Sequence, residues 1–165
     1  MKRTAALGAL VGITLLPLAV SGANQTASLT VSATVTNNCT ISTAALTFAP
    51  YDPVVANATN NLDGTGRVTV ACTKGAAPTI GLGSGSSASG SARRLSDGNG
   101  NYLSYELYQD SGHSVSWANS GLGLLTAGAA TSKAARDFTV YGRIAGNQDV
   151  PAGSYADTVV ATVNF

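Results

Sequence analysis

Residues 27–39 read ASLTVSATVTNNC, and they open the part of the chain whose pattern decides its fold. Apolar and polar side chains alternate along them. One face of an extended chain would carry Leu29, Val31, Ala33 and Val35, and the other Thr30, Ser32 and Thr34. A period of two is typical of a half-buried β-strand because successive side chains point to opposite faces. The stretch therefore predicts a strand of about nine residues, roughly 30 Å long when extended.

The same alternation recurs further along the chain. It aligns Val68, Val70 and Cys72 in RVTVACT, Leu103, Tyr105 and Leu107 in YLSYELY, and Val159, Ala161, Val163 and Phe165 in DTVVATVNF. Turn-forming sequences such as NATNNLDGTG, GSGSSASGS and AGNQDVPAGS separate these stretches. The glycines of GLLTAGAATSKAA oppose a long helix there. We therefore predict an all-β chain that forms one immunoglobulin-like β-sandwich of two packed sheets.

A basic start and an apolar run precede this domain. MKR is followed by AALGALVGITLLPLAV, and the small residues SGA occupy positions 21–23. This pattern predicts a secretory signal peptide over residues 1–23, because the apolar run is too short to span a bilayer comfortably. Without Lys2 and Arg3, seven basic residues face eight acidic ones. We expect neither nucleic acid nor a membrane surface as a partner of the mature chain.

Cys39 and Cys72 are the two cysteines of the chain. In an exported protein an even pair is most simply a disulfide, and closing this loop would stabilise the fold by about 3–4 kcal/mol. A zinc site would need further ligands near both thiols, and the only histidine, His113, lies in the distant DSGHS stretch. We expect a disulfide, no metal and no cofactor.

Candidate catalytic residues are sparse. A hydrolase needs a base, a nucleophile and an orienting group held together, and we interpret His113 as a solvated turn residue. Glu106 is the only glutamate, so we expect it to make a cross-strand or surface contact and not to act in a glycosidase pair. We expect Asp63 and Asp97 to cap turns. The sequence predicts no catalytic residue and no enzyme.

Four aromatic residues raise the alternative of a sugar-binding platform: Tyr102, Tyr105, Tyr108 and Trp117. Alternation places Tyr105 in the core and turns Tyr102 and Tyr108 outward. We therefore favour core packing with surface tyrosines over a shared platform.

The last alternating strand reaches Phe165, and we expect it to lack a partner on its C-terminal side. A sandwich with an open apolar groove would aggregate. The N-terminal strand has two ways to close such a groove: it folds back onto its own domain, or it adds to a neighbouring copy by β-strand addition. Head-to-tail addition produces an open filament. The sequence alone leaves both solutions open.

Nearly all of the predicted mature chain resembles one family. The matching stretches, in order, are NNCTI, VTVACTKGAAPTIGL, RRLS leading into LSYELYQD, the lone Trp117, VYGRI, and QDVPAGSYADTVVATVNF. With these stretches the chain resembles the spore coat protein U domain family, which includes the pilins of archaic (Csu-type) chaperone-usher pili. One departure is Ala118 after Trp117, where such sequences often carry glycine.

The resemblance implies an incomplete immunoglobulin-like domain, residues 37–165, that lacks its final strand and follows a donor strand at 24–36. A periplasmic chaperone would occupy the groove first, and an outer-membrane usher would exchange it for the donor strand of the next subunit. The donor side chains would be Leu29, Val31, Ala33 and Val35, with Ala27 as a further candidate. The acceptor-groove and chaperone-pairing edge would hold Val159, Ala161, Val163 and Phe165.

The resemblance also implies a function. The chain would be a structural subunit of a cell-surface pilus, exported through the periplasm, that polymerises with identical or related subunits and supports adhesion and biofilm formation. Two alternatives stay open. One is a self-complemented monomeric spore-coat or surface protein closed by its own residues 27–35, and the other is a carbohydrate-binding tip adhesin.

Overall fold

The structure is a computed structural model that describes residues 22–165, so nearly all of the predicted signal peptide lies outside the described residues. The chain divides into two units, residues 1–34 and 35–165. Residues 22–38 form no regular secondary structure, and the side chains of Leu29 and Val31 are 88% and 85% exposed. Because a strand is defined by pairing, the donor strand predicted at residues 24–36 stays a prediction.

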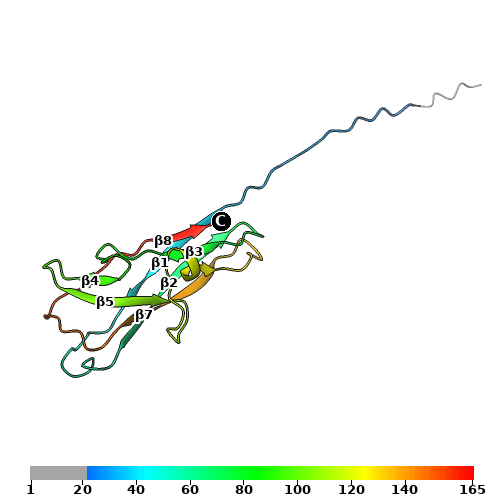
Figure 1. Cartoon of the computed structure of the whole chain (residues 1–165). Coiled ribbons are helices and arrows are strands. Elements are labelled where there is room, and N and C mark those ends of the chain that lie inside the picture. The colour runs from blue at the N-terminus through cyan, green and yellow to red at the C-terminus, as the bar shows by residue number, and fades with distance from the viewer. Residues whose placement is uncertain (1–21) are drawn as a thin grey trace, which may run out of the picture. The chain divides into compact units, whose positions relative to one another are not determined.

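The second unit consists of two antiparallel sheets and one 3₁₀ turn, and residues 22–165 contain no α-helix. The larger sheet has the order β1 (Cys39–Thr47), β2 (Leu62–Cys72), β7 (Arg136–Ile144), β5 (Tyr102–Tyr108), β4 (Arg94–Ser96). The smaller sheet has the order β6 (Leu125–Thr126), β3 (Thr79–Leu82), β8 (Ala161–Asn164), and the turn is η1 (Gly121–Gly123). Figure 1 shows β8, in red, beside β3. The predicted all-β, immunoglobulin-like sandwich is confirmed.

The core contains six residues that the alternating pattern placed on one face, namely Val68, Val70, Cys72, Leu103, Tyr105 and Leu107, together with residues from other segments. The buried set includes Val68, Val70, Cys72, Ile80, Leu82, Leu103, Tyr105, Leu107, Trp117, Val140 and Ile144. Trp117 is fully buried, and its indole N–H donates to the Ile80 carbonyl at 2.9 Å. Tyr105 is 5% exposed while Tyr102 is 40% exposed, so the prediction that alternation separates these two rings is confirmed.

Cys39 and Cys72 face each other across β1 and β2 and form the predicted disulfide. Their side chains belong to the core or pack against it. The bridge therefore fastens the first residue of the edge strand β1 to the last residue of β2.

Arg93 ties the smaller sheet to the segment around Trp117. Its guanidinium donates to the carbonyls of Gly83 and Leu82, both at 2.9 Å, and to that of Trp117 at 2.7 Å. Burial lowers the pKa of Arg93, and the carboxylate of Glu106, 3.7 Å away, opposes that shift. A buried cation that donates to three carbonyls satisfies groups that would otherwise lack partners.

Glycines replace side chains on the inner face of β2 and β7, at the end of the sheet away from the disulfide. A Cβ atom at Gly66 would lie 2.8 Å from the Leu46 Cβ, and one at Gly142 would lie 2.9 Å from the Phe48 Cζ. Gly64 also lies under Phe48, whose Cδ1 would be 2.9 Å from an added Cβ. The side chains of Leu46 and Phe48 therefore rest directly on the backbone of the sheet.

Candidate functional site

An apolar groove of about 1020 Å³ lies within the second unit, between β1 and the chain that leads into β8. One wall consists of residues 43–51, and the other of residues 150–153 and 155–159 together with Ala161. Core side chains line it between these walls: Val68, Leu82, Leu95, Leu103, Tyr105, Leu107, Val140 and Ile144. The groove thus opens onto the hydrophobic core between the edges of two sheets.

The β8 wall presents apolar side chains and outward-facing backbone groups from the same residues. The Gly83 N–H donates to the Val160 carbonyl at 2.9 Å. Hydrogen-bonded pairs alternate along an antiparallel ladder, so Val160 and Thr162 turn their backbone groups toward β3. Val159, Ala161 and Val163 therefore turn theirs away from β3, at the edge of the sheet. The side chains of these three residues are half-buried against the core.

The β1 wall is also the edge of its sheet. The Thr73 N–H donates to the Asn38 carbonyl at 2.8 Å, and by the same alternation Ile41 and Thr43 turn their backbone groups away from β2. The register then shifts between Ala44 and Thr47. A bulge of this kind re-aims the side chains that follow. After this bulge, the side chains of Leu46 and Phe48 lie over the inner glycines of β2 and β7.

Asp157 holds the second wall of the groove in place. Its carboxylate accepts hydrogen bonds from the Tyr105 hydroxyl at 2.8 Å, from the Ser86 hydroxyl at 2.9 Å and from the Ser87 N–H at 3.0 Å. Burial raises the pKa of Asp157, but these hydrogen bonds outweigh it and hold the pKa below its ordinary value. Burial and the neighbouring carboxylate together raise the pKa of Tyr105.

Tyr51 closes the other wall at its end. Its hydroxyl accepts a hydrogen bond from the Gln148 N–H at 2.9 Å and lies 3.2 Å from the Ala145 carbonyl, to which it donates. The contact fixes the segment after β1 to the loop after β7. Side chains of the domain itself thus anchor both walls of the groove.

The residues predicted for the acceptor edge fall at different places. Val159 and Ala161 line the groove, Val163 packs against the core beside it, and Phe165 is 55% exposed. Donor and acceptor roles for these residues stay predictions.

Sequence reasoning missed the β1 wall of the groove. Leu46, Phe48 and Tyr51 lie in ALTFAPY, where the bulge breaks the two-residue alternation. One signal was present in LDGTGRV, where glycines occupy two consecutive inward positions of a strand. Such glycines mark a close approach of another part of the chain.

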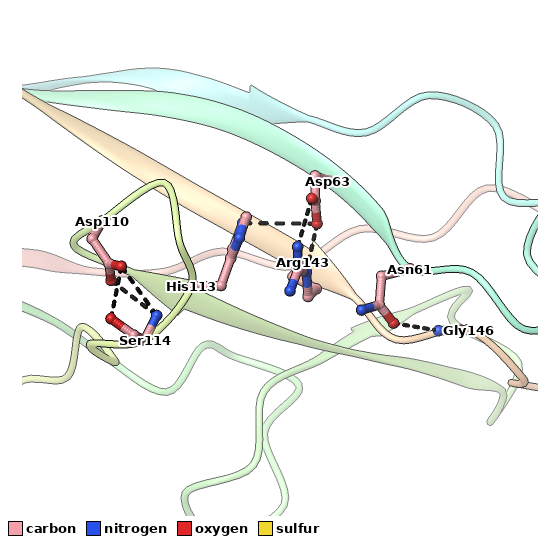
Figure 2. Close-up of polar contacts among 7 residues, drawn as sticks. All are labelled: Asn61, Asp63, Asp110, His113, Ser114, Arg143 and Gly146. Carbon is pink, nitrogen blue, oxygen red and sulfur yellow. Dashed lines mark hydrogen bonds and ion pairs between the residues drawn. The ribbon is translucent and has the colours of Figure 1, made fainter.

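His113 is not the solvated turn residue that we expected. Its side chain is 7% exposed, and its ring lies between those of Tyr108 and Tyr141, at centroid distances of 5.1 Å and 6.3 Å. Figure 2 shows the loop of His113 folded over the sheet, held by Asp110, whose carboxylate accepts from the Ser114 N–H and hydroxyl. The short turn buries the ring because the two tyrosines provide an aromatic surface for it.

Asp63 is not a turn cap either. It lies within β2, and Arg143 of β7 donates to both of its carboxylate oxygens at 2.7 Å, as Figure 2 shows. This bidentate pair holds the pKa of Asp63 below its ordinary value. The expected turn role is confirmed for Asp97, which accepts from the Asn99 and Asn101 N–H groups at 2.8 and 3.1 Å.

Glu106 makes the cross-strand contact that we expected. Its half-exposed carboxylate lies 3.7 Å from the guanidinium of Arg93, which comes directly before β4, the strand paired with β5. Within residues 22–165, no three His, Cys, Asp or Glu side chains gather in a metal-binding arrangement. Over the same residues, no helix has the length and hydrophobicity needed to cross a bilayer.

Comparison with known proteins identifies the family. The model of the Spore Coat Protein U domain matches residues 25–162. The chain belongs to the Spore Coat Protein U domain family. "Protein U" of Myxococcus xanthus is 39% identical over 157 residues, which cover 87% of this chain and 86% of that protein. The predicted family membership is therefore confirmed.

A solved structure shares the fold of the present chain. It is the CsuC–CsuE chaperone–tip adhesion subunit pre-assembly complex from the archaic chaperone-usher Csu pili of Acinetobacter baumannii, with a TM-score of 0.58 and 22% identity. The match covers 80% of this chain and 41% of the solved chain. The present chain thus spans about two fifths of the length of that solved chain.

Proposed function

We propose that this protein is a non-enzymatic structural subunit of a cell-surface chaperone-usher pilus. Residues 27–35 of one copy fill the apolar groove of the next copy and so join the subunits head to tail. The observation that carries this proposal is a groove of about 1020 Å³ bordered by two strand edges, β1 and β8. Family membership and the fold shared with a Csu pilus complex support it.

The alternation of residues 27–35 suits such a groove. In an antiparallel pair, residues that exchange backbone hydrogen bonds lie opposite each other and point to the same face. Val159, Ala161 and Val163 present both backbone groups and half-buried side chains, so a strand paired with them turns alternate side chains into the groove. The inserted set is Leu29, Val31, Ala33 and Val35.

Burial makes this addition stable. Covering a valine or leucine side chain contributes about 1.5–3 kcal/mol, and each backbone hydrogen bond adds about 0.5–1.5 kcal/mol net. The inserted strand would contribute several such terms, which must be lost together for the subunits to separate. The joined fibre is therefore expected to dissociate slowly.

An uncovered groove of this size makes an unassembled subunit prone to aggregate. A periplasmic chaperone therefore covers it after export, and an outer-membrane usher directs the exchange for a neighbouring subunit. The name of the solved structure, a chaperone–subunit pre-assembly complex, supports the chaperone step. The fibre then serves adhesion and biofilm formation at the cell surface.

The proposal is tested by placing a charge on the inserted face. We expect Val31→Asp to leave a subunit that purifies with its chaperone and forms no fibres, because a carboxylate would enter the apolar groove unpaired. Ser32→Asp places the same charge on the opposite face and is the matched control. Detergent-resistant ladders on gels and negative-stain images measure assembly. Val31→Asp fibres of wild-type length would overturn the proposal.

A further inference from the structure

The residues just before β1 are held by Thr73. Besides the hydrogen bond from its own N–H to the Asn38 carbonyl, the Thr73 hydroxyl accepts from the Asn38 N–H at 3.1 Å. The same hydroxyl lies 3.2 Å from the Thr36 carbonyl and 3.3 Å from the Asn38 carbonyl, and donates to this pair. The β1–β2 pairing thus continues beyond the disulfide, and residues 36–38 keep the direction of β1.

A different arrangement of residues 36–38 is compatible with the sequence. If they formed a three-residue turn, Val35 would lie opposite Cys39 and Ala33 opposite Ile41. Cys39 and Ile41 pack against the core, and opposite residues in an antiparallel pair share a face. In the same register Val31 would lie opposite Thr43, which lines the groove, so the side chains from Val31 toward the N-terminus would face the chain's own groove.

The turn itself has suitable residues. Residues 36–38 are Thr-Asn-Asn, and asparagine tolerates the left-handed backbone that closes a three-residue hairpin loop. The chain therefore has the register and the turn for capping itself, which would remove the donor strand from polymerisation. Some interaction must therefore favour the straight form, in which residues 36–38 continue the direction of β1, over the turned form.

We propose that Thr73 is the positioning residue that keeps residues 36–38 straight and so reserves residues 27–35 for another copy. This inference rests on the proposed function. In the turned form, the N–H and carbonyl of Asn38 would leave Thr73, and the hydroxyl would lose its contacts with Asn38 and Thr36. The hydroxyl therefore stabilises the straight form selectively.

The test compares Thr73→Val with Thr73→Ser in the full mature chain. The first removes the hydroxyl at nearly constant shape, and the second retains it. Thr139→Val is the matched control, since Thr139 is an exposed residue of β7, a strand inside the larger sheet and not at either edge that borders the groove. Each chain is refolded from denaturant, and the ratio of monomer to detergent-resistant ladder is measured. Amide hydrogen exchange then reports protection of residues 29–35 in the monomer fraction.

We expect Thr73→Val to raise the monomer-to-ladder ratio roughly 2- to 12-fold, the effect of one hydrogen bond, with residues 29–35 protected in the monomer. Thr73→Ser and Thr139→Val should behave as wild type. A merely destabilised domain would not show this protection. Asn38→Gly, which eases the turn and leaves Thr73 in place, should shift the ratio in the same direction.

Three outcomes would overturn either the role of Thr73 or the proposed function. Wild-type ratios for Thr73→Val and for Asn38→Gly, with ladders in all samples, would overturn the role of Thr73 and leave the proposed function standing. A raised ratio with unprotected residues 29–35 would also overturn it, because self-capping would be absent. A wild-type chain that gives only protected monomers and no ladder would contradict the proposed function itself.

Discussion

Gly66 shapes the groove through the side chain that it lacks. An added Cβ would lie 2.8 Å from the Leu46 Cβ and 3.1 Å from the Leu46 Cα and N atoms. Two of these contacts are with backbone, which cannot swing aside as the end of a side chain can. The edge strand β1 can approach the inner face of β2 only because this position is a glycine.

Gly66→Ala should therefore destabilise the domain. We expect a loss of about 1–3 kcal/mol in the free energy of unfolding, the usual cost of overpacking a filled interior. Gly128→Ala is the matched control, because no atom lies within 4 Å of a Cβ added there. Urea unfolding of both variants, each with its groove filled in the same way, measures the difference in stability. Equal midpoints for the two alanines would contradict this account of the groove.

Individual polar residues were the least predictable from sequence. The burial of His113 depends on Tyr108 and Tyr141, which come from two different strands and meet only in the folded sheet. Asp63 precedes a glycine, as many turn residues do, but its partner Arg143 lies 80 positions away. Asp97 was predicted correctly because all of its partners are local.

Among the elements, strands with unbroken alternation were predictable and the others were not. β5 matches YLSYELY residue for residue, and β2 contains the predicted RVTVAC. β7 carries Gly142 at an inward position, which hides its alternation, and the bulge after Ala44 hides that of β1. The groove was still harder to predict from the sequence. Its two walls lie about a hundred positions apart and come together only through the topology of the sheets.

The pairing of β1 with β2 depends on the disulfide at its first residue. We expect replacement of Cys39 and Cys72 by serine to lower the free energy of unfolding by about 3–4 kcal/mol, since the bridge restricts the unfolded chain across a separation of 33 residues. Thermal unfolding of the double variant against wild type, both bound to chaperone, tests this. Identical transitions would show that the bridge is dispensable for stability.

At the scale of the whole molecule, acid should weaken the domain. The pKa values of Asp63, Asp97 and Asp157 lie below their ordinary range, because Arg143 pairs with the first and hydrogen bonds reach the other two. Depressed folded pKa values stabilise the domain above the unfolded pKa, and this contribution is lost as the pH falls through the folded values. The domain should therefore lose this stability mainly below about pH 4.

Urea titrations between pH 7 and pH 2 check this expectation. The wild-type midpoint should fall mainly below about pH 4, and Asp157→Asn should show a smaller fall because one of the contributing carboxylates is gone. Asp149→Asn, which removes an exposed carboxylate, is the control. A wild-type midpoint that stays constant down to pH 2 would contradict the assignment.

The position of the Cys39–Cys72 bridge has a mechanical consequence for a fibre assembled as proposed. Tension between neighbouring subunits would enter each domain through residues 36–38 and reach Cys39 first. The covalent link passes that load directly to Cys72 on the adjacent strand, so β1 cannot be peeled from its sheet hydrogen bond by hydrogen bond. A pulled fibre should therefore yield elsewhere before this strand unzips, and chemical reduction should make it tear at lower force.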